Sequence, residues 1–180
     1  MARLPLPDRE ALTDEAQRQR WDRLAARGPV LNVFRLFMLN PEVELNAFSL
    51  WRASGLDARK RELVILRCAF VKQSTYEWHQ HVRIAVAAGI SPTEINALRS
   101  WRDAAGFSDD ERALLAYVDA LAAQPRPEDD VFAAVARGRT PAELLGVTAL
   151  VTTYFQLAQM MATFDLETEE PFVGWEVAAS

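Results

Sequence analysis

A carboxylate and an imidazole in this chain stand where two consecutive helices can bring them together. Glu62 lies within the apolar run RELVILRC (61–68), and His81 ends the run STYEWHQH (74–81). A carboxylate removed from water favours its neutral form unless it is paired, and such a group can exchange protons near neutral pH. We therefore predict that Glu62 and His81 are catalytic proton-transfer groups.

Helical geometry decides which neighbours share the face of His81. A helix turns about 100° per residue, so His79 points roughly 140° away from Ser74 while His81 falls on the same stripe as Ser74. Glu77 stands four residues before His81 and can hold its ring. We predict a pocket lined by the substrate-binding residues Ser74, Glu77, Tyr76 and Trp78.

Each of these residues also has a purely structural interpretation. Arg59 lies one turn before Glu62 and can pair with it on the helix surface. His81 can be a core histidine, and Ser74-x-x-Glu77 is a capping box for the helix that carries it. A cap and a site can coexist, because a helix N-terminus also favours an anionic ligand.

The composition narrows the class of protein. The chain has 180 residues, half of them apolar, and a net charge of -5. It therefore fits one domain over residues 1–180 with a sizeable core, and it lacks the basic stripe of a nucleic-acid-binding protein. The N-terminus shows no secretory signal, so we expect a cytoplasmic protein.

A single cysteine, Cys68, excludes a CxxC pair, and two histidines without a ligand cluster predict no metal site.

Apolar residues recur with helical spacing along nearly the whole chain, which predicts an all-α, single-domain multi-helix array. The predicted helices span 8–27, 30–38, 41–54, 58–72, 75–88, 92–102, 109–123, 128–137 and 141–164. Capping boxes begin at Ser91, Ser108 and Thr140, and glycines suited to helix ends stand at 89 and 138.

Two segments near the C-terminus allow more than one interpretation. The uncharged stretch 144–164 is long enough to span a membrane, but threonines and glutamines recur in it every three or four residues. That polar line favours a helix packed against other helices, so we expect no membrane partner. The C-terminal tail, 165–180, either folds back on the body or reaches a second subunit.

The sequence of residues 61–90, RELVILRCAFVKQSTYEWHQHVRIAVAAGI, followed by SPTEI, resembles the carboxymuconolactone decarboxylase family and its alkylhydroperoxidase-D-like relatives. The resemblance places the core motif at 58–102. In the peroxidase-like branch, a Glu is followed by CxxC and then by a His, and these positions fall on Glu62, Ser74, Glu77 and His81. Both acid–base partners are kept and both thiols are lost. Cys68 cannot replace the pair, because a resolving thiol must attack the first sulfur directly.

The decarboxylase branch needs no thiol, metal or organic cofactor. The resemblance thus implies a cofactor-free lyase for decarboxylation or related proton transfer on a small lactone or carboxylic acid. It also implies a homo-oligomer, either a dimer or a trimer or hexamer. Two alternatives stay open: a peroxiredoxin-like, peroxide-detoxifying protein, disfavoured without CxxC, and a non-catalytic ligand-binding or assembly module.

Overall fold

The computed structural model describes residues 3–40, 43 and 51–178, and every regular element among them is a helix. The all-α prediction is confirmed. Contacts group the chain into two compact units, residues 1–45 with 161–171 and residues 46–160 with 172–180. This grouping leaves the single domain over 1–180 a prediction. The smaller unit contains η1 (Arg9–Ala11), α1 (Glu15–Ala25) and α2 (Asn32–Phe37).

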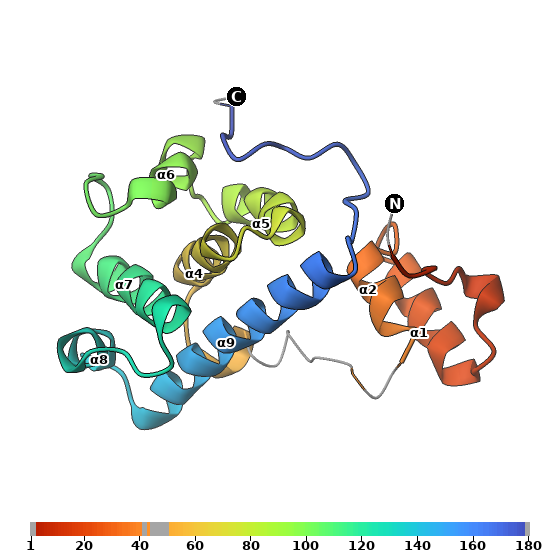
Figure 1. The fold of residues 1–180 in the computed structure, drawn as a ribbon, viewed down its shortest axis with the longest axis horizontal. Coiled ribbons are helices and arrows are strands. Elements are labelled where there is room, and N and C mark those ends of the chain that lie inside the picture. Colours follow the sequence, from red (N-terminus) through yellow and green to blue (C-terminus); the bar gives the residue numbers. More distant parts are fainter. Residues whose placement is uncertain (1–2, 41–42, 44–50, 179–180) are drawn as a thin grey trace. The chain divides into compact units, whose positions relative to one another are not determined.

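The larger unit carries most of the helices and all of the predicted site residues. Its elements are α4 (Ala58–Val71), α5 (Thr75–Ala87), α6 (Pro92–Ala97), η3 (Leu98–Ser100), α7 (Asp109–Ala123), α8 (Asp129–Ala136) and α9 (Pro141–Thr163) as far as Met160. In Figure 1, α4 runs beside α5 on one side and α7 on the other, and α8 packs against α7.

Most of the predicted helices form, but the first is shorter than expected. The helix predicted over 8–27 is instead η1 followed by α1, because the side chain of Asp14 accepts from the Gln17 amide and starts a new helix. The helix predicted over 92–102 becomes α6 and a 3-10 turn ending at Ser100. The prediction over 41–54 falls mainly outside the described residues.

Local signals fix the other helix ends as predicted. Ser91 and Ser108 each form a complete capping box, and Thr140 does the same with Glu143. Gly89 has φ +84° and Gly138 has φ +74°, the left-handed conformation that ends helices and that glycine adopts without strain. Hydrogen bonds between residues close in the sequence therefore determine where these helices begin and end.

The helix α4 is the centre of the larger unit. Its residues from Glu62 to Ala69 are all buried, so neighbours cover it on every side. The core cluster joins α4, α5, α6 and α7 through apolar side chains, among them Leu66, Trp78, Ile95 and Leu115. A carboxylate at position 62 therefore stands in the interior and must be matched by partners from adjacent helices.

The end of the tail folds back on the larger unit. The Trp78 indole N–H donates to the Gly174 carbonyl at 2.9 Å, and the Val173 amide donates to Nδ1 of His79 at 3.2 Å. Asn96 of α6 binds both backbone groups of Val177. Figure 1 shows this last segment passing beside α5 and ending near α6. Of the two possibilities predicted for the tail, folding back holds for residues 172–177.

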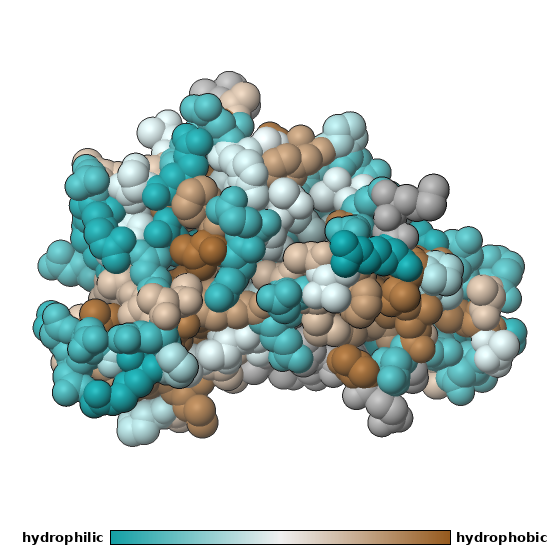
Figure 2. All heavy atoms as spheres, viewed as in Figure 1, coloured by the Kyte–Doolittle hydropathy of each residue, from teal (hydrophilic) through white to brown (hydrophobic). Residues whose placement is uncertain are grey.

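The helix α9 is long and apolar enough to cross a membrane by length and composition alone, a test that core helices of soluble proteins also pass. Large apolar side chains exposed on the larger unit are scattered, with Val86, Phe132 and Leu145 the examples among the described residues. Figure 2 agrees, since hydrophilic residues cover most of the visible face over α7 and α8.

Candidate active site

Glu62 and His81 meet in the interior, where α4 packs on α5. Nδ1 of His81 lies 2.7 Å from Oε2 of Glu62, whose side chain is fully buried. A carboxylate only accepts hydrogen bonds, so Nδ1 is the donor and the neutral ring carries its lone pair on Nε2. Among the described residues, Nε2 has no hydrogen-bond partner, and the His81 side chain keeps 10% of its surface exposed. Nε2 is thus the atom placed to take or give a proton.

Arg61 completes the ion pair on the other oxygen of Glu62. Its Nε donates to Oε1 at 3.0 Å, and its guanidinium lies 4.6 Å over the ring of Trp51. The alternative pairing of Glu62 with Arg59 was wrong. Arg59 instead bridges the capping-box glutamates of α6 and α7, Glu94 and Glu111.

Aromatic rings enclose the imidazole of His81 on two sides. The ring of Tyr154, from α9, stands edge-on to it with centroids 5.2 Å apart, and the ring of Trp51 stands edge-on at 6.2 Å. The Trp51 indole donates to the Tyr154 hydroxyl at 2.9 Å. Burial raises the pKa of Tyr154, so the hydroxyl stays protonated. The two rings brace each other and leave the imidazole little freedom to turn.

A glycine in α9 makes this enclosure possible. A Cβ at Gly146 would lie 2.0 Å from the carbonyl oxygen of Ala53, far inside contact distance. The backbone of Gly146 therefore packs directly against the backbone of Ala53. Ala53 lies two residues after Trp51, and Gly146 lies about two helical turns before Tyr154. The glycine at 146 is what lets the segment that carries Trp51 reach α9.

The link between α4 and α5 is tight, and it determines the surroundings of Glu77. Gln73 takes the left-handed conformation with φ +54°, and its amide donates to the Phe70 carbonyl. The Ser74 amide donates to the Ala69 carbonyl at 2.8 Å, which completes a Schellman motif at the end of α4. Ser74 also caps α5, because its hydroxyl accepts from the Glu77 amide.

The reciprocal half of the predicted Ser74–Glu77 capping box does not form. The Ser74 amide already serves α4, so the Glu77 carboxylate has no backbone donor to return to. Its side chain is buried, and neither oxygen has a hydrogen-bond partner among the described residues. Because the carboxyl group is buried without a hydrogen-bond partner, burial raises the pKa of Glu77 well above its usual range. A protonated acid therefore stands one turn from His81.

The other two predicted substrate-binding residues, Tyr76 and Trp78, are buried. Trp78 is fully buried and packs between Phe70 and Trp175 of the tail, and Tyr76 is buried on α5. Thus the structure brings Glu62 and His81 into contact and places Glu77 one turn from His81 on α5. The contacts of Trp78 are with the core and the tail.

Sequence reasoning missed Arg61, Trp51 and Tyr154. Residues adjacent in a helix do not normally face one another, so Arg61 gave no signal as a partner of its neighbour. Trp51 and Tyr154 lie far apart in the sequence, and no local pattern connects them.

The thiol of Cys68, on α4, is fully buried. It has no exposed surface, and burial raises its pKa well above the usual value for cysteine. A thiol in this state is a poor nucleophile. Within the described part of the chain, no three His, Cys, Asp or Glu side chains gather as a metal site would require.

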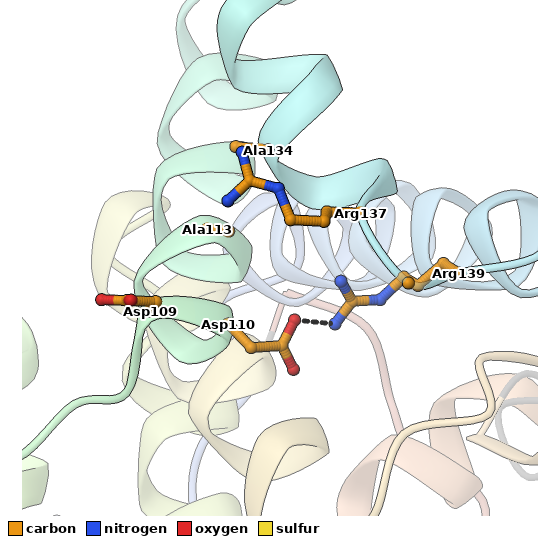
Figure 3. A pocket seen from close by; sticks show the side chains of 7 residues that line it. Asp109, Asp110, Ala113, Ala134, Arg137 and Arg139 are labelled. Carbon is orange, nitrogen blue, oxygen red and sulfur yellow. Dashed lines mark ion pairs between the residues drawn. The ribbon is translucent and has the colours of Figure 1, made fainter.

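A separate hollow of about 500 Å³ lies between α7, α8 and the turn before α9 (Figure 3). Asp110 lines this hollow and binds Arg139 at 2.7 Å and Lys60 of α4 at 2.9 Å. These ion pairs tie three segments together. The hollow is lined by Asp109, Asp110, Ala113, Ala134, Arg137, Gly138 and Arg139, none of which belongs to the Glu62–His81 pair.

Residues 43–120 match the model of the Carboxymuconolactone decarboxylase family. This match covers less than half of the chain, and the matched residues include Glu62, Glu77 and His81. The resemblance stated from the sequence is therefore confirmed. No curated protein matches the sequence.

Three solved structures share the fold. The alkylhydroperoxidase AhpD core of an uncharacterized peroxidase-related protein from Ralstonia eutropha has 21% identity, covers 98% of this chain and 97% of its own, and gives a TM-score of 0.79. An uncharacterized peroxidase-related protein from Silicibacter has 14% identity, 96% and 94% coverage and a TM-score of 0.74. A Cys-to-Ala variant of the debrominase Bmp8, bound to 2,3,4-tribromopyrrole, has 15% identity, 94% and 92% coverage and a TM-score of 0.71. At these identities the likeness shows the fold alone.

Proposed function

We propose that this protein is a cofactor-free acid–base enzyme that decarboxylates a small lactone or carboxylic acid, or moves a proton on a related substrate. The observation that carries the proposal is the 2.7 Å contact between Nδ1 of His81 and Glu62, with Nε2 left without a partner among the described residues. A carboxylate that orients an imidazole and stabilises its protonated form is a common arrangement for general acid–base catalysis.

The chemistry needs only groups that this site contains. In decarboxylation, the bond between carbon and the departing carboxylate breaks, and its electron pair stays on the substrate as an enolate. The protonated ring of His81 gives its Nε2 proton to the substrate carbon and is reprotonated by water. Glu62 stabilises the imidazolium at the start of the cycle, which favours keeping the proton at Nε2 until the enolate forms.

A thiol peroxidase is a weaker candidate for this chain. That chemistry requires a thiolate that peroxide can reach and a second thiol to resolve the oxidised one. Cys68 is fully buried, its pKa is raised, and it is the chain's single cysteine. The peroxidase-related names among the structural neighbours belong to those proteins.

The proposal is tested by screening small lactones and β-keto acids for carbon dioxide release. With a substrate in hand, Glu62→Gln and His81→Asn should each lower kcat by about 10²–10⁴-fold, the usual contribution of a general acid or base. The matched control is His79→Asn, because His79 is the other buried histidine and asparagine can still accept from Val173.

Two results count against the proposal. Full activity in both Glu62→Gln and His81→Asn would show that neither residue takes part in catalysis. A ligand that raises the melting temperature while the whole screen yields no product favours the binding module instead.

A further inference from the structure

We propose that Arg61 binds a carboxylate of the substrate and so selects anionic substrates at the Glu62–His81 site. The inference rests on the proposed acid–base function and deepens it by naming the residue that recognises the substrate. It assigns Arg61 a role beyond neutralising a buried glutamate.

The guanidinium of Arg61 is held rigidly but is only partly used. Nε donates to Glu62, and the planar group stacks on Trp51 at 4.6 Å. Nη1 and Nη2 have no partner among the described residues, and the side chain keeps 18% of its surface exposed. Two parallel N–H groups at the free edge of a fixed guanidinium match the two oxygens of a carboxylate.

Glu62 joins the guanidinium of Arg61 to the imidazole of His81. One of its oxygens binds Arg61 and the other binds His81, so the guanidinium and the imidazole share a single small carboxylate. When His81 is protonated, the negative charge of Glu62 faces the positive charges of both Arg61 and His81, so these three side chains together carry a net positive charge. An anionic substrate restores neutrality in a place where solvent screening is weak.

The charge on the bound group decides which carboxylate Arg61 holds. Loss of carbon dioxide requires negative charge to leave the departing carboxylate, and a guanidinium bound there would stabilise the ground state and slow the step. Arg61 therefore holds a carboxylate that remains on the substrate, while the reacting carbon faces Nε2 of His81.

Binding measurements test this role without requiring turnover. The probes are the keto acid levulinate and its uncharged amide, levulinamide, measured by isothermal titration calorimetry. Levulinate should bind Arg61→Gln about tenfold or more weakly than wild type, because a charge-assisted pair of hydrogen bonds is lost. Levulinamide should bind the two proteins equally. Arg52→Gln is the control, since Arg52 is exposed and lies beside Trp51 in the sequence.

The Glu62→Gln variant separates this inference from the proposed function. It removes the internal anion that competes for Arg61, so levulinate should bind it more tightly than wild type even as turnover is lost. Circular dichroism verifies that each variant is folded, and Arg61→Lys, which keeps the charge without the fork, should recover only part of the affinity.

Three outcomes overturn the role of Arg61: equal levulinate affinity in wild type and Arg61→Gln, equal affinity of wild type for the acid and the amide, or absence of levulinate binding to wild type. Each can occur whether or not the Glu62–His81 pair proves catalytic.

Discussion

Replacing Glu77 with glutamine should stabilise the protein more strongly as the pH rises. The carboxyl group is buried, neither oxygen has a partner among the described residues, and burial raises its pKa well above the usual range. In the unfolded chain the same group titrates near its ordinary value, about 4.3. Between these two pKa values the folded protein holds a proton that the unfolded chain has released.

The sign and size of the effect follow from that difference. The stability contributed by protonated Glu77 is fully present below the unfolded pKa and is lost as the pH rises toward the folded pKa. Within this window wild type loses about 1.4 kcal/mol for each pH unit at this one site. Glutamine has nearly the same shape and does not titrate, so the gap between Glu77→Gln and wild type should widen by the same amount.

Urea unfolding followed by circular dichroism at pH 5, 6, 7 and 8 measures the gap directly. Taking the difference between the two proteins cancels every group that titrates alike in both. A gap that stays constant over this range would show that Glu77 is ionised and paired in the folded protein, and the reasoning about its burial would fail.

Three further predictions concern other parts of the larger unit. Gly146→Ala should destabilise the fold by about 1–3 kcal/mol, because the Cβ of the new alanine would clash with the Ala53 carbonyl. Thermal denaturation measures this loss. An unchanged melting temperature would mean that the two backbones do not approach so closely. Cys68 should resist a thiol reagent such as dithionitrobenzoate in the native protein and react fully in urea, since its thiol is buried and its pKa is raised; rapid native labelling would contradict its burial. Hydrogen bonds from Arg59 and Ser91 outweigh burial and lower the pKa of Glu94 to about 2, so its stabilising effect is present above pH 4 and is lost as the pH falls toward 2. Glu94→Gln should therefore be less stable than wild type at pH 7 and similar to it near pH 2 by urea unfolding, and equal stability at pH 7 would rule out this ion pair as a stabilising contact.

The sequence predicted those features that depend on neighbouring residues. Serines 91 and 108 cap their helices because a glutamate three residues later can reach back, and both partners of each box lie within one turn. The same rule failed at Ser74, where α4 ends so close to α5 that one amide would have to serve two helices. The competing Schellman motif took the amide, and Glu77 was left without its donor.

The candidate site was predictable only in part. Helical geometry selected His81 over His79, and the structure indeed places His81 against Glu62 and His79 against the tail. The enclosure by Trp51 and Tyr154 depends on contacts between residues more than a hundred positions apart. Such contacts follow from how whole helices pack, which spacing along one helix does not reveal.

Glu62 fixes the neutral ring of His81 with Nδ1 protonated and Nε2 available for proton transfer. Nitrogen-15 NMR of the two histidines, assigned with His79→Asn, measures the tautomer directly in the neutral ring. We expect His81 to hold the Nδ1–H tautomer in wild type and to lose this preference in Glu62→Gln. An Nε2–H tautomer in wild type, or a ring that exchanges freely between both forms as in water, would contradict it.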